Sequence, residues 1–323
     1  MNKNDKNELL VDWVEFTCFQ DCEELGSEER KKLEEWGFNL EKFEHLESGL
    51  MGYKKRMWGE YTQILFAGNT GMKTHIILSA KGVRAYEVNN KAENLINMLT
   101  HEDVGFTRID LALDIKDNSI EFKQLLEYLN NNHVVTRFKK YKYVVEKQIE
   151  EDGQQTLGET IYFGSRSSNI FIRIYDKAKQ MKQNEDSWIR IEIVYKDKHA
   201  NALALYIAQG KKNLGELFSQ TLNNYIRFVE KSNDSNKRRW KTADFWEKIL
   251  EDSSRLKLSF HGTEVDPKKT ADWFKTKVAP SLAFLNLYWG GDMQIVENVI
   301  TGAEEKMPEK YKKILREMGL IEE

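Results

Sequence analysis

Residues 170–177 read Ile170-Phe-Ile-Arg-Ile-Tyr-Asp-Lys177, and this stretch decides how the fold is interpreted. It alternates as a β-strand does, so Phe171, Arg173 and Tyr175 share one face with Lys177, while the other face is mostly branched aliphatic. A tyrosine between two cations is unusual for a purely structural sheet. It suits a nucleophile that attacks a phosphate.

Two further stretches, residues 108–114 and 189–193, carry the same alternation. Their isoleucine and leucine side chains lie on one face and their charged side chains on the other. If the three strands are neighbours in one sheet, their polar faces merge. The merged surface would carry Tyr175 together with these charged residues: Asp110, Asp114, Arg173, Lys177, Arg190 and Glu192.

Carboxylates that converge on one face repel one another, and a divalent cation is the usual remedy. Ligation by oxygen alone favours Mg²⁺ or Mn²⁺ over zinc. We therefore expect a metal site among Asp110, Asp114 and Glu192, and the pattern leaves open whether Asp110 or Asp114 is a ligand. Such an ion would hold a phosphate oxygen and offset charge in the transition state.

The cations have a catalytic interpretation as well. A tyrosine with a pKa of ~10 attacks poorly at neutral pH. We expect flanking cations and a metal to favour the phenolate of Tyr175. Arg173, Lys177 and Arg190 would also stabilise the added charge of a phosphorane-like transition state.

A solvated face of an antiparallel sheet is the alternative, because it shows the same alternation of apolar and charged residues. Alternation alone favours that simpler interpretation. The composition favours a site: such a face usually carries long Lys/Glu mixtures with Thr, whereas here Asp–Asp, Arg–Tyr–Lys and Arg–Glu sets surround one tyrosine. The six histidines are dispersed and form no His-x-His pair, so they offer no competing centre.

Composition limits the classes of protein to which the chain can belong. The chain has 323 residues, 40% of them hydrophobic, which suffices for one large core or two moderate ones. Its net charge of −3 favours no class of partner. Cys18 and Cys22 are too few for a disulfide framework. A polar N-terminus and the lack of an apolar run of ~20 residues predict a soluble, cytoplasmic protein with no membrane partner.

The order of elements predicts an α+β fold, with a mostly antiparallel central sheet, flanking helices and a helix-rich C-terminal part. Residues 1–230 would form the catalytic domain, with core motifs at 105–195, and residues 231–323 a helix-rich region that binds DNA or dimerises. Strands are expected at 11–19, 60–67, 74–80, 106–115, 159–163, 170–177 and 188–196, with short ones at 224–229 and 255–260. Helices are expected at 27–36, 91–100, 200–209, 213–222, 242–251, 267–278, 291–301 and 308–318, and Ser119 is expected to cap another.

Two segments, residues 161–182 and 231–241, are locally rich in Lys and Arg. Lysine and arginine contacts to phosphates, with aromatic stacking, are typical of single-stranded DNA binding. Merely solvated basic loops remain the alternative. The candidate DNA contacts are Arg166, Ser167, Lys179, Arg238 and Arg239.

Four motifs follow one another in the chain: Gly105-Phe-Thr-Arg-Ile-Asp-Leu-Ala-Leu-Asp114, Tyr162-Phe-Gly-Ser-Arg-Ser-Ser168, Phe171-Ile-Arg-Ile-Tyr-Asp-Lys177 and Trp188-Ile-Arg-Ile-Glu192. In this order they closely resemble the Rep_trans replication initiators of small rolling-circle plasmids of Gram-positive bacteria. They also resemble the related MobT-type relaxases of integrative conjugative elements. The resemblance is strong over residues 100–200 and looser over residues 10–100.

The resemblance implies a site-specific DNA nickase. Tyr175 falls on the nucleophile position, where it would form a 5′-phosphotyrosyl bond and free a 3′-hydroxyl. Asp110 and Glu192 fall on acidic positions of the family's metal site. The implied partners are origin DNA with a single-stranded or hairpin nick site, a helicase, and a second copy of the chain.

The leading hypothesis is thus a metal-dependent nickase and strand transferase that initiates rolling-circle replication of a plasmid or mobile element. A relaxase for conjugative transfer would use the same chemistry. A third hypothesis, from a different class, is a non-catalytic DNA-binding protein that uses the sheet face as a platform.

Overall fold

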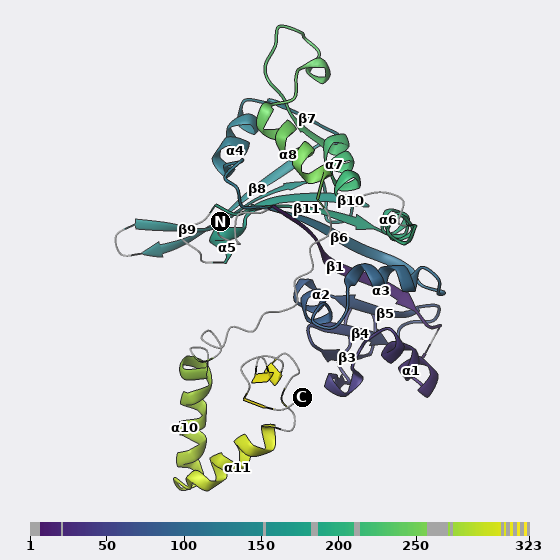
Figure 1. Cartoon of the computed structure of the whole chain (residues 1–323), viewed down its shortest axis with the longest axis vertical. Helices are drawn as coiled ribbons and strands as arrows, with labels where there is room; N and C mark the ends of the chain where they lie inside the picture. The colour runs from purple at the N-terminus through teal and green to yellow at the C-terminus, as the bar shows by residue number, and fades with distance from the viewer. Residues whose placement is uncertain are drawn as a thin grey trace. The chain divides into compact units, whose positions relative to one another are not determined.

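The computed structural model describes residues 7–20, 22–150, 153–181, 187–209, 214–256, 271 and 274–304, with a few residues at 307, 311–312, 315–316 and 320–321. It has two compact units, Met1–Phe260 and His261–Glu323 (Figure 1). The boundary between the two units lies after Phe260 and not after residue 230. The reason is that α8 (Asp244–Ser254) packs against α7 (Leu214–Tyr225) within the first unit. The predicted role of the C-terminal region in DNA binding or dimerisation stays a prediction.

A ten-stranded sheet is the frame of the first unit, and its strands lie in the order β2-β3-β4-β5-β1-β6-β11-β10-β9-β8. Every neighbouring pair in it is antiparallel. The strands are β1 (Glu8–Cys18), β2 (Glu44–Leu46), β3 (Lys55–Gly59), β4 (Thr62–Phe66), β5 (Thr74–Leu78), β6 (Gly105–Ile115), β8 (Tyr141–Glu150), β9 (Gly153–Phe163), β10 (Ile170–Asp176) and β11 (Ile189–Lys196). A separate two-stranded sheet pairs β7 (Val134–Thr136) with β12 (Ile226–Phe228).

Helices flank this sheet, so the predicted α+β class is confirmed. In the first unit they are α1 (Ser27–Glu35), α2 (Ala80–Tyr86), α3 (Ala92–Leu99), α4 (Phe122–Asn130), α5 (Lys177–Gln180), α6 (Lys198–Ala208), α7 and α8, with short 3₁₀ turns η1 (Leu40–Lys42) and η2 (Lys237–Arg239). The second unit contains η3 (Phe274–Val278), α10 (Ala279–Tyr288) and α11 (Met293–Glu304). Among the helices of the described ranges, none is both long and apolar enough to cross a bilayer.

Most predicted elements are found within a few residues of their expected ends. The predicted cap at Ser119 is wrong, because Glu121 is the residue that precedes α4. The segment at 68–74 joins two antiparallel strands, β4 and β5. The predicted strand at 255–260 and helix at 308–318 fall largely outside the described residues, as does much of the predicted helix at 267–278.

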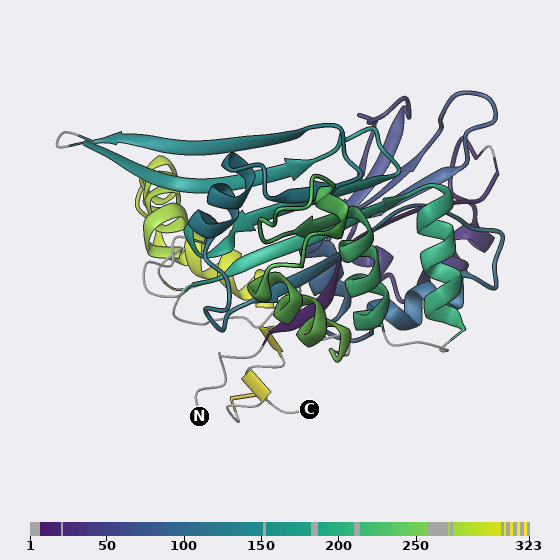
Figure 2. The ribbon, with the colours of Figure 1, turned by 90° about the horizontal axis from the view of Figure 1, so that it is seen from above.

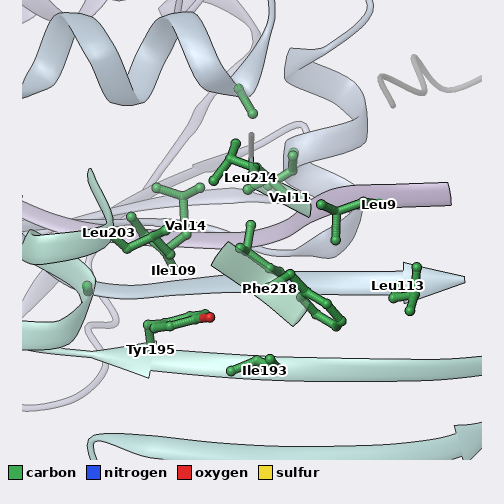
Figure 3. Packing of buried hydrophobic residues seen from close by; sticks show 14 of the residues in the cluster. Leu9, Val11, Val14, Ile109, Leu113, Ile193, Tyr195, Leu203, Leu214 and Phe218 are labelled. Carbon is green, nitrogen blue, oxygen red and sulfur yellow. The ribbon is translucent and has the colours of Figure 1, made fainter. Parts of the chain in front are cut away.

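The main core lies on the apolar face of the central strands. Ile109 and Leu113 of β6 and Ile193 of β11 pack with Leu203 of α6 and Phe218 of α7 (Figure 3). Figures 1 and 2 show α4, α7 and α8 together on this side of the sheet. Burying one such side chain contributes roughly 1.5–3 kcal/mol, so this layer fixes the central strands firmly. Their opposite face carries the charged residues.

Strand β1 contains a β-bulge that matters for the charged face. Its register with β6 shifts between Val11 and Trp13. Val11 and Val14 both belong to the core, so Asp12 is the extra residue that the bulge accommodates. The bulge places the Asp12 carboxylate beside Arg190 of β11.

Candidate active site

The three strands with polar residues are neighbours, in the order β6-β11-β10, as the alternation predicts. Tyr175 lies directly across from Arg190, and Arg190 lies across from Asp114. One step along, Arg173 faces Glu192 in the same way. The register therefore gathers the predicted polar residues on one face of the sheet centre.

Tyr175 is the centre of a small polar group. Its side chain is 7% exposed, and its hydroxyl donates a hydrogen bond to Oε2 of Glu192 at 3.3 Å. Arg173 donates to the other oxygen of Glu192. The Arg173 guanidinium and the Lys177 ammonium lie 5.7 and 5.6 Å from the centre of the tyrosine ring. The nucleophile candidate is thus bracketed by two cations and bonded to one carboxylate.

The resting state of this tyrosine is the neutral phenol. Burial raises the pKa of Tyr175 well above its usual value, and the charge of Glu192 adds to the effect. Arg190 and Arg173 act in the opposite direction but are outweighed. The flanking cations do not by themselves favour the phenolate, and the expectation that cations and a metal do so together stays a prediction. Attack by Tyr175 needs a group that accepts its proton, and the bonded Glu192 is in position to do so.

Asp110 and Glu192 are two carboxylates whose charges oppose each other. Both are completely buried. Arg108 donates to both oxygens of Asp110, at 2.8 and 2.6 Å. Burial raises the pKa of Asp110 well above its usual value, Arg108 opposes this change, and the charge of Glu192 adds to it. A buried carboxylate whose charge is opposed by a second carboxylate would favour an added cation.

Asp114 has a different environment. Both of its oxygens accept hydrogen bonds from the Arg190 guanidinium, at 2.6 and 2.7 Å. Arg190 also donates to Asp12 at 2.9 Å. Burial acts to lower the pKa of Arg190, but its carboxylate partners, Asp114 first, raise that pKa well above the usual value. Asp114 is thus a partner of Arg190, which itself faces Tyr175.

Sequence reasoning missed Asp12. A signal for it does exist: the apolar residues of β1 that enter the main core are Leu9 and Val11, and then Val14 and Phe16, so their parity changes. A change of parity within one strand marks a bulge, because side chains otherwise alternate strictly.

The choice among the three predicted metal ligands stays a prediction. No group of three or more His, Cys, Asp or Glu side chains that could hold a metal occurs among the residues with a described position. Mg²⁺ is usually held by one or two carboxylates, with waters and phosphate oxygens completing the shell. All three carboxylates accept hydrogen bonds from an arginine: Asp110 from Arg108, Glu192 from Arg173 and Asp114 from Arg190. The charges of Asp110 and Glu192 also oppose each other, which favours this pair as the ligands.

Of the three predicted DNA contacts near β10, two lie away from Tyr175 and the third lies beside it. Arg166 and Ser167 belong to the turn before β10, at the opposite end of that strand from Tyr175. Lys179 follows Tyr175 on α5, where it pairs with Glu159 and lies 3.3 Å from Asp176. Their role in DNA binding stays a prediction.

Arg238 and Arg239 lie elsewhere, in η2. This turn joins the layer of α7 and α8 (Figure 1), on the apolar side of the sheet and therefore opposite Tyr175. Arg239 pairs with Asp234 at 3.4 Å. The structure does not bring these two arginines into the group around Tyr175.

This chain is similar to known replication initiators and to a relaxase. The sequence profile of the Rep_trans family, described as replication initiation factor, matches residues 104–300. This chain belongs to that family. It is 25% identical over 284 residues to the "Putative DNA relaxase NicK" of Bacillus subtilis (strain 168), covering 83% of this chain and 79% of that protein.

Two further relatives are replication initiators by name. A replication initiation protein of Staphylococcus aureus is 33% identical over 104 residues, which cover 32% of this chain and 27% of that protein. The solved rolling circle replication initiator protein from Geobacillus stearothermophilus has a TM-score of 0.70 and 31% identity, and covers 79% of this chain and 100% of its own. The likeness to a solved initiator extends over most of the chain.

Proposed function

We propose that this protein nicks one strand of DNA and later rejoins it, and that it thereby initiates rolling-circle replication of a plasmid or mobile element. Membership of the replication initiation factor family supports this function. The observation that carries it is the hydrogen bond between the Tyr175 hydroxyl and Glu192, on a face that also holds Arg173 and Arg190.

The reaction uses Tyr175 as the nucleophile. Its phenolic oxygen attacks the scissile phosphorus, a bond between that oxygen and phosphorus forms, and the bond from phosphorus to the 3′ oxygen breaks. The proton of the phenol passes to Glu192, and the departing 3′ oxygen takes up a proton to become a hydroxyl. The DNA 5′ end stays on Tyr175 as a phosphotyrosine, so the energy of the phosphodiester is kept for the rejoining step.

The cations have separate roles in this step. Arg173 orients Glu192 through a direct hydrogen bond. Arg190 lies across from Tyr175 and, with Lys177, adds positive charge where the transition state becomes more negative. Burial lowers the pKa of Lys177, and the positive charge of Arg190 lowers it further.

We propose that the nicking is metal-dependent and that the ion is Mg²⁺ or Mn²⁺, held by Asp110 and Glu192. The ion would supply positive charge to a phosphate oxygen and to the transition state. Two buried carboxylates with oxygen donors suit either of these hard cations.

The nucleophile is tested with oligonucleotides that cover the origin, incubated with protein and Mg²⁺ or Mn²⁺ and resolved on denaturing gels. The wild-type chain is expected to give a cut strand and a covalent protein–DNA adduct, and Tyr175→Phe is expected to give neither. Tyr162→Phe is the matched control, because Tyr162 lies in the neighbouring strand β9, across from Arg173. An adduct with Tyr175→Phe would show that another residue is the nucleophile.

The same experiment distinguishes a nickase from a non-catalytic DNA-binding protein. A protein that only binds DNA would retain the oligonucleotides but cut none of them. Retention without cutting by the wild-type chain, with either metal, would favour that hypothesis over a nickase.

A relaxase for conjugative transfer is the second candidate. The match to a relaxase covers 83% of this chain, whereas the match to the staphylococcal initiation protein covers 32%. A mobilisation assay distinguishes the two roles, because a relaxase mobilises a plasmid that carries its origin into recipient cells. A helicase and a second copy of the chain remain predicted partners of either activity.

A further inference from the structure

Two adjoining hollows lie on the side of the sheet opposite Tyr175, between β7, α7 and η2. Their volumes are 470 and 590 Å³, and Val135, Thr136 and Arg238 line both. Together they carry six cations and no acidic residue. We call these cations the basic surface: Arg137, Lys139, Lys140, Arg227, Lys237 and Arg238.

Three of these cations are held in place by neutral groups. Arg227 donates to the carbonyl oxygens of Trp240 and Arg238, at 2.8 and 2.6 Å. Lys237 donates to the carbonyl and side-chain oxygens of Asn132, at 3.0 and 2.7 Å. The Arg137 guanidinium lies 5.8 Å from the centre of the Tyr225 ring. These contacts order the side chains without cancelling their charge.

The other three cations project from the surface. Lys139, Lys140 and Arg238 are exposed, and within the described part of the chain none of them forms an ion pair. The whole chain has a net charge of −3, so a group of six cations without acids is a local departure from the average. It would attract a polyanion even though the chain as a whole would not.

The neutral lining fits a nucleic-acid backbone. Asn132, Asn236, Asn223, Asn224 and Thr136 line the hollows with amide and hydroxyl groups. Such groups, together with Lys and Arg, make most protein contacts to phosphate and sugar. Single-stranded binding also uses successive exposed aromatic rings. Tyr141, at 44% exposed, is the exposed ring of this lining, which favours a duplex.

We propose that the basic surface binds the sugar–phosphate backbone of duplex DNA next to the nick site, while the strand to be cut reaches Tyr175 on the other face. The proposal rests on the proposed nicking function. Lys139 and Lys140 lead directly into β8, the edge strand of the large sheet. DNA held on the basic surface can therefore continue around this edge toward the polar face.

The test removes the three projecting charges with Lys139→Gln, Lys140→Gln and Arg238→Gln in one variant of the full chain. A matched control removes the exposed charges of Lys31, Lys54 and Lys81 by the same substitution. The affinity for a fluorescent duplex from the origin is measured by anisotropy at several salt concentrations. Nicking of a single-stranded oligonucleotide that spans the cut site is measured in parallel.

The slope of log affinity against log salt is negative, and its magnitude is expected to decrease by about 2–3 in the test variant, because each lost phosphate contact contributes ~0.9. Single-strand nicking is expected to stay within about twofold of wild type, and the control to bind duplex as wild type does. Wild-type duplex binding by the test variant, or an equal loss in the control, would overturn the proposal. If the wild-type chain cuts no strand at all, the nicking function fails, while duplex binding still tests the basic surface.

Discussion

At the scale of single residues, Asp110 and Asp114 lie on the same face of β6 but have different partners. Asp110 is held by Arg108 and opposed by the charge of Glu192, whereas Asp114 is held by Arg190, which faces Tyr175. We predict that Asp110→Asn raises the metal concentration needed for half-maximal nicking about tenfold or more. Asp114→Asn should instead lower the rate at saturating metal, on the order of tenfold, because a charge-assisted bond contributes ~1.5–3 kcal/mol.

To check that Asp110 and not Asp114 is a metal ligand, the rate of single-strand nicking is measured over a titration of Mg²⁺ or Mn²⁺. The shift of the melting temperature on addition of metal gives a second check that does not depend on activity. Asp103→Asn is the control, because that side chain is 87% exposed and pairs with Lys73 at the surface. If Asp114→Asn moves the metal requirement as far as Asp110→Asn does, Asp114 is a ligand and our choice of ligands is wrong.

At the scale of elements, the contact between α7 and α8 depends on Gly215. A Cβ atom at this position would lie 2.2 Å from the carbonyl oxygen of Ser253 and 2.5 Å from that of Leu256. Gly215→Ala should therefore push the end of α8 away and lower the free energy of unfolding by roughly 1–3 kcal/mol. Urea unfolding measures this, and Gly158→Ala, where a Cβ meets nothing within 4 Å, should be neutral. If Gly215→Ala and Gly158→Ala are equally stable, α7 and α8 can move apart at little cost and the prediction is wrong.

The sequence predicts the central strands well because each has one apolar face, and β6, β10 and β11 lie side by side as inferred. It does not predict that the charged face is buried, since that depends on segments distant in sequence: Asp12 reaches Arg190 only through the bulge in β1. Helix α2 was not predicted, because its seven residues include Gly82 and are too few for a clear period. The basic surface joins residues 137–140 with 227–238, and only the tertiary fold brings these segments together.

At the scale of the whole molecule, the position of Trp246 bears on where the first unit ends. Trp246 is completely buried, and its ring centroid lies 4.8 Å from that of Phe228. A chain cut after residue 230 loses this tryptophan and exposes the apolar surface beneath it. We predict that residues 1–260 unfold cooperatively in urea, whereas residues 1–230 aggregate or unfold at a clearly lower concentration. Similar midpoints for both chains would place the folding boundary at residue 230 after all.

The burial of Tyr175 has a consequence for when the enzyme can act. With only 7% of the side chain exposed, an intact double helix about 20 Å wide cannot bring a phosphate to the hydroxyl, so the strand must first leave its partner. Separating ten base pairs costs roughly 14 kcal/mol at ~1.4 kcal/mol per step. Negative superhelical torsion can supply that work, and the first cut releases it. The depth of one side chain would thus make cutting a response to the winding of the circle.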